Sequence, residues 1–65
     1  MVLIDAFVDQ GRKRAVVRVN GTSYTVSEGE TFADNFRALS IDPPCATFLY
    51  GDSSFTLCQG ERVLK

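Results

Sequence analysis

The sequence predicts an all-β domain, a small antiparallel barrel or sandwich of about five or six short strands. Two observations support this prediction. Apolar and polar residues alternate with a period of two, which is typical of half-buried strands. Turn-forming residues also recur at intervals of roughly 8 to 12 residues. With 65 residues, and neither a repeat nor a linker visible, the chain is expected to form one small domain over residues 1–65.

The chain begins with an apolar strand. Either Leu3 or Ile4, and either Phe7 or Val8, are expected to face the core. A polar turn that contains Gly11 ends this strand.

Asn20-Gly21 is the strongest hairpin signal in the chain and predicts a two-residue type I′ loop. The flanking runs 15–19 and 22–26 are rich in β-branched residues and read as its two strands. The register set by this loop pairs six residues on the face expected to be core: Ala15 with Val26, Val17 with Tyr24, and Val19 with Thr22.

Residues 31–39 admit a helical interpretation. Phe32, Phe36 and Leu39 have helical spacing, and Thr31 with Asp34 resembles a capping box. Such a helix would have only about two turns and would be marginal on its own.

The alternative for this region is a strand over residues 36–41, which we favour. In that strand Leu39 and Ile41 would point to one side, and Phe36 and Ala38 to the other. The prolines that follow would end the strand. The last residues, 59–65, read as a polar tail that could add one more short strand.

The stretch from Cys45 to Cys58 reads as a hairpin around Gly51-Asp52, with glycine where a type II′ turn requires it. This register places Phe48 opposite Phe55, both facing the core, and Cys45 opposite Cys58. A four-residue loop would shift the pairing but keep the faces.

The two cysteines are therefore expected to form a disulfide, worth roughly 3 kcal/mol in the chain-entropy model. The alternative is a pair of free, half-buried thiols that act as small apolar groups. A disulfide indicates an oxidising compartment. We therefore expect an extracytoplasmic domain that belongs to a longer exported or membrane-anchored parent.

Catalysis is not expected. The chain has no histidine, its carboxylates lie mostly in turns, and no phosphate-binding glycine loop is present. The two cysteines match neither a redox nor a zinc motif, so no metal or other cofactor is expected.

The charges give two binding hypotheses. With seven basic and eight acidic residues, a net charge of −1 provides no general attraction to nucleic acid. Residues 12–14 with Arg18 form a basic cluster, so a small barrel that binds single-stranded nucleic acid is the alternative function.

Protein recognition is the favoured hypothesis. An imperfectly closed barrel exposes a strand edge that can accept a strand from a partner, or from a second copy to give a homodimer. The outer side of the 14–26 hairpin provides the candidate contact residues, which are Arg14, Val16, Arg18, Ser23 and Thr25. A sequence designed only to fold, without a function, is a further alternative.

The pattern over residues 15–57 resembles a known family. A strand leads to Asn20-Gly21, then Tyr-Thr-Val and an acidic-Gly-acidic turn; a strand ending in Ser-Ile follows, and then a hairpin ending in Thr-Leu. This order is similar to the periplasmic homology-region domain of the type II secretion inner-membrane protein C, and to the type IV pilus assembly lipoprotein P.

The resemblance implies a small β domain without catalytic residues. It would link an inner-membrane assembly to the secretin or to another pilus component, through the early strands that correspond to residues 15–19 and 22–26. The cysteine pair is not a general feature of that family.

Overall fold

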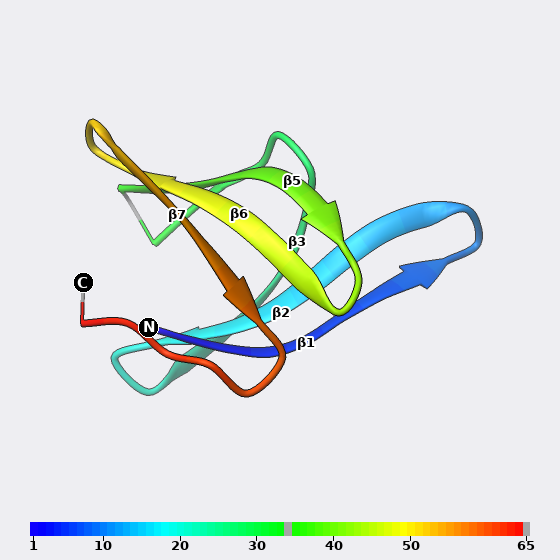
Figure 1. The fold of residues 1–65 in the computed structure, drawn as a ribbon, viewed down its shortest axis with the longest axis horizontal. Helices are drawn as coiled ribbons and strands as arrows, with labels where there is room; N and C mark the ends of the chain where they lie inside the picture. The colour runs from blue at the N-terminus through cyan, green and yellow to red at the C-terminus, as the bar shows by residue number, and fades with distance from the viewer. Residues whose placement is uncertain (34, 65) are drawn as a thin grey trace.

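A computed structural model describes residues 1–33 and 35–64, and it is all-β, as predicted (Figure 1). An antiparallel sheet of three strands, β1-β2-β3, packs against one of four, β4-β5-β6-β7. The strands are β1 (Val2–Asp9), β2 (Arg12–Val19), β3 (Thr22–Ser27), β4 (Thr31–Phe32), β5 (Phe36–Asp42), β6 (Cys45–Tyr50) and β7 (Ser53–Cys58). The strand interpretation is therefore confirmed by β5. The helical one is wrong for residues 31–33 and 35–39, and Asp34 lies outside the described residues.

Two-residue loops set the register of the hairpins. Asn20 and Gly21 have φ angles of 50° and 83°, and the positive values at both positions are those of the predicted type I′ turn. At Gly51-Asp52 only the glycine has a positive φ, 60°, as a type II′ turn requires. The predicted pairs Val17 with Tyr24 and Phe48 with Phe55 are both present.

The core lies between the two sheets. Its buried apolar side chains are Leu3, Ala6, Ala15, Val17, Val19, Val26, Phe32, Phe36, Ala38, Ile41, Ala46, Phe48 and Leu57. The predicted core face of β2 and β3 needs one correction: Thr22 is exposed, because it adjoins the solvent-exposed Asn20-Gly21 loop. Tyr24 is only half-buried, as is Phe55.

Each sheet contains one β-bulge, and the bulges correct the predicted alternation. In β5 the register shifts between Ala38 and Ser40, so Ala38 and Ile41 are both fully buried and Leu39 is 43% exposed. The prediction that Leu39 and Ile41 point to the same side is therefore wrong, because the extra residue of the bulge reverses the alternation. The same shift in β1 leaves Leu3 buried and Ile4 41% exposed.

A glycine corner carries β3 into the other sheet. Gly29, with φ 86°, donates from its backbone N–H to the carbonyl of Ala38 at 2.7 Å. The Ala38 N–H donates in turn to the Glu30 carbonyl at 2.9 Å. The Glu30 carboxylate accepts the Ser27 N–H at 2.5 Å. The corner is therefore held both by its backbone bonds to Ala38 and by this side chain.

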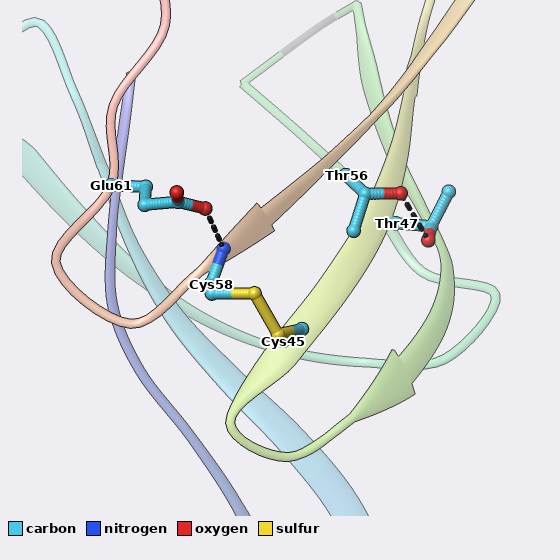
Figure 2. The surroundings of a disulfide bond; sticks show 5 residues. All are labelled: Cys45, Thr47, Thr56, Cys58 and Glu61. Carbon is cyan, nitrogen blue, oxygen red and sulfur yellow. Dashed lines mark hydrogen bonds between the residues drawn. A yellow bond between two sulfur atoms is a disulfide. The ribbon is translucent and has the colours of Figure 1, made fainter.

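A second corner carries the end of β7 towards β1. Gly60, also with φ 86°, donates to the carbonyl of Leu3 at 2.8 Å, and the Leu3 N–H donates to the Glu61 carbonyl at 3.0 Å. The Glu61 carboxylate accepts the Cys58 N–H at 2.7 Å (Figure 2). The tail then follows β1 as far as a Val63–Met1 backbone pair, although the tail forms only an isolated bridge and no further strand; Lys65 is not among the described residues.

The two corners reveal an internal repeat that we did not detect in the sequence. Residues 22–30 read TSYTVSEGE and residues 53–61 read SSFTLCQGE. Strands β1, β2 and β3 therefore correspond to β5, β6 and β7, and each half ends by pairing with the first strand of the other half. The chain is a pair of structurally equivalent halves, residues 1–32 and 36–63, that form one barrel-like domain from two sheets with open edges at β3 and β7.

Candidate protein-interaction site

The five predicted contact residues lie together on the outer side of the three-stranded sheet. Arg18 is directly opposite Ser23, and Val16 directly opposite Thr25. Arg14 is the next outward residue of β2. The hairpin register set by the Asn20-Gly21 loop therefore brings all five to one surface.

The same side of β1 adds apolar residues that were not predicted as contacts. Val2 pairs with Arg18 and Phe7 with Arg14, and both Val2 and Phe7 are half-buried. Val16, between the two arginines on β2, is also half-buried. These three side chains place apolar surface beside the arginines, although Val16 itself lies between Asp5 of β1 and Thr25 of β3.

Four arginines share this surface, which we call the cationic face: Arg12, Arg14, Arg18 and Arg62. Arg62 joins it because the tail pairs Arg62 with Val2, directly across from Arg18. A hollow of about 240 Å³ lies here, lined in part by Val2, Arg18 and Arg62.

Two carboxylates, Asp5 and Asp9, lie on the same side of β1, so the cationic face carries an excess of two positive charges. Asp9 is opposite Arg12, and Asp5 accepts the backbone N–H of Ala6 at 2.9 Å. Among the described residues the one ion pair joins Lys13 to Asp42 at 3.7 Å, away from the cationic face. The Nε of Arg14 is buried and has no acceptor among the described residues.

The cationic face ends at an open strand edge. In a two-residue hairpin, residues alternate between hydrogen-bonded and non-hydrogen-bonded pairs with the partner strand. Val19 and Thr22 close the loop, so the backbone groups of Ser23 and Thr25 point away from β2. No described residue pairs with those groups, whereas the next outward N–H, that of Ser27, is capped by Glu30.

The described residues contain no group of three or more His, Cys, Asp or Glu side chains that could hold a metal ion. They also contain no helix that is long and apolar enough to cross a membrane. The predicted disulfide between Cys45 and Cys58 is present, with an S–S distance of 1.93 Å, on the outer side of the other sheet (Figure 2).

Comparison with known proteins adds no relative: no protein-family model, curated protein or solved structure matches the chain.

Sequence reasoning missed Phe7 and Arg62 as members of this surface. Phe7 was expected to be available for the core. The bulge at Ile4 reverses the alternation of side chains in the rest of β1, so Ala6 faces the core and Phe7 faces outward. Arg62 reaches the face through a pairing that spans almost the whole chain. The Gly-Glu pairs of the two corners were the available signal for that pairing.

Proposed function

We propose that this domain is a non-catalytic protein-interaction module that accepts an extended strand of its partner along the edge of β3. The observation that carries the proposal is the open edge at Ser23 and Thr25, which borders the cationic face. An added strand would satisfy the two outward N–H and two outward C=O groups of these residues.

The neighbouring side chains would give the added strand its specificity. Outward residues of a partner strand would continue the rows Arg18–Ser23 and Val16–Thr25 across the sheet. Arg14, Arg18 and the apolar Val16 therefore form the side-chain rim of the backbone contact, which favours a partner strand that carries acidic residues.

The biological setting is proposed from the sequence resemblance. It favours a type IV pilus or type II secretion assembly, with the secretin or another assembly component as the partner. The Cys45–Cys58 disulfide is compatible with the extracytoplasmic location that such a role requires, within a membrane-anchored parent.

Site-specific photocrosslinking tests the proposal in the source cells. A benzoylphenylalanine side chain at Ser23 is expected to give an adduct with one envelope protein, identified by mass spectrometry as a secretin or pilus component. The matched control is the same side chain at Thr47, on the outer side of the other sheet. Equal adducts from both positions, no adduct, or a cytoplasmic partner would each contradict the proposal.

Single-stranded nucleic acid is the competing ligand, since four arginines and Phe7 share the cationic face. Fluorescence anisotropy with a labelled oligonucleotide separates the two functions. We expect no binding even at low salt; binding that weakens steeply as salt rises would favour the nucleic-acid function.

A further inference from the structure

The internal repeat provides a second open edge, on β7. Ser54 and Thr56 correspond to Ser23 and Thr25 in the repeat TSYTVSEGE and SSFTLCQGE. The Gly51-Asp52 loop closes on the pair Tyr50 and Ser53, so the backbone groups of Ser54 and Thr56 point away from β6. No described residue forms a backbone hydrogen bond with them.

This edge has none of the features that normally protect exposed strands. Natural edges carry charged residues, proline or a bulge, which prevent pairing with another chain. Strand β7, Ser53–Cys58, has no charged residue or proline, and its register with β6 is continuous. It is also linked to β6 by the Cys45–Cys58 disulfide and by a 3.0 Å hydrogen bond between the hydroxyls of Thr47 and Thr56 (Figure 2).

We propose that the β7 edge pairs with β7 of a second copy of this chain to form a two-fold symmetric dimer. In an antiparallel arrangement centred on Phe55, Ser54 of one copy is opposite Thr56 of the other. The two residues of this pair exchange two N–H to C=O hydrogen bonds. The two-fold symmetry repeats the pair, because Thr56 of the first copy is likewise opposite Ser54 of the second.

The ends of the edge limit the pairing to a closed dimer. Beyond Thr56, the Cys58 N–H is already bonded to the Glu61 carboxylate, and the Cys58 carbonyl accepts the Glu61 N–H at 2.9 Å. Only Ser54 and Thr56 therefore present outward groups on β7, and one second copy satisfies all of them. The β3 edge of each copy remains open for the proposed partner.

Charge favours β7 over β3 for self-association. Pairing through β3 would place two cationic faces on one continuous sheet, each with Arg14 and Arg18 on the strand behind the junction. The corresponding residues behind β7 are Cys45 and Leu49, which carry no charge. Like charges suppress a pairing, so the two equivalent edges select different partners.

Sedimentation equilibrium of the oxidised chain, from roughly 1 µM to 1 mM, tests the dimer. We expect a reversible monomer–dimer equilibrium that Ser54→Pro shifts to monomer, because this proline removes an outward N–H without breaking the β6 ladder. Ser23→Pro, the same change at the equivalent position of the other half, should leave the dimer intact. A wild-type chain that stays monomeric throughout this range, or a dimer lost in Ser23→Pro but kept in Ser54→Pro, overturns the proposal.

Amide exchange followed by NMR keeps the test valid if Ser54→Pro fails to fold. In the wild-type chain, the Ser54 and Thr56 amides should exchange more slowly at high concentration than at low concentration. The Ser23 and Thr25 amides should show no such dependence. Unchanged exchange at Ser54 and Thr56 while the chain dimerises would place the interface elsewhere and contradict the proposal. Loss of the dimer would leave the Ser23 crosslink intact, so the two proposals fail separately.

Discussion

The two halves of the domain have the same strand order and the same kind of corner but different surfaces. Both contain a bulge, at Ile4 and Leu39, and a glycine corner fixed by a glutamate. Outside, the first half carries three of the four arginines of the cationic face, whereas the second carries the disulfide and the hydroxyl pair of Thr47 and Thr56. The shared features join the two sheets, whereas the differences lie on the surfaces proposed to bind partners.

The largest backbone difference is the length of the first hairpin in each half. The residues that join Phe7 to Arg14 are Val8–Lys13, whereas only Pro43 and Pro44 join the corresponding residues Asp42 and Cys45. Both loops have two residues, but the two additional residue pairs, Val8 with Lys13 and Asp9 with Arg12, make the β1–β2 hairpin project at the right of Figure 1. This projection carries Arg12 and extends the cationic face.

Inside the barrel, equivalent positions differ in size in a compensating way. Leu3 corresponds to Ala38, and Ala6 to Ile41, all within the core. At each of these two positions a large side chain in one half corresponds to a small one in the other, so the halves contribute their bulk at different places in the core. The two halves are therefore complementary and not interchangeable.

The strongest test of this asymmetry compares Phe48 with its counterpart Val17, both 0% exposed. Phe48→Ala is expected to lower the free energy of unfolding by about 3–5 kcal/mol, which can prevent folding of so small a domain. Val17→Ala should cost clearly less, about 2 kcal/mol, because it removes less volume. Urea denaturation of both variants measures the difference, and equal losses would contradict the unequal contribution of the halves.

The second test transfers the disulfide between halves. Arg14 and Ser27 occupy the positions that correspond to Cys45 and Cys58. The double variant Arg14→Cys with Ser27→Cys is therefore expected to form a second disulfide and raise the stability by about 3 kcal/mol. Reducing the native bond should remove a similar amount.

Thermal unfolding under oxidising and reducing conditions, with mass spectrometry of the thiols, measures both effects. Loss of Arg14 also removes its buried Nε, which lacks an acceptor among the described residues. If both introduced thiols stay free, the equivalence of the two hairpins is wrong.

The smallest expected effect concerns the corners. Glu30→Ala and Glu61→Ala each remove a carboxylate that accepts a backbone N–H, and each should cost about 1 kcal/mol because both groups are exposed. Similar losses in chemical denaturation would support the equivalence of the corners. A loss confined to Glu61→Ala would show that only the corner beside the disulfide depends on its carboxylate.

The hairpins were predictable because short-range chemistry determines them. Asn20-Gly21 and Gly51-Asp52 specify their turn types, and each turn fixes the register of its strands. That register was sufficient to pair Cys45 with Cys58. It also brought Arg14 and Val16 to one surface.

The features that were not predicted depend on interactions between distant residues. A period-two pattern cannot reveal a bulge, because one inserted residue such as Leu39 reverses every side chain that follows. The repeat was hidden because the β1–β2 hairpin is longer than the equivalent β5–β6 hairpin. The number of residues between equivalent positions is therefore not constant along the chain. Arg62 joins the candidate site through the tail, which only the complete fold can position.

The pairing of Met1 with Val63 places the start and the finish of the domain side by side (Figure 1). By the equivalence of the halves, this junction matches the short link that connects Phe32 to Phe36. A host protein could therefore carry the domain as an insertion in a surface loop, entering and leaving at adjacent points. Joining the two ends and opening the chain between Phe32 and Phe36 would also exchange the order of the two halves along the chain while every strand pairing is kept.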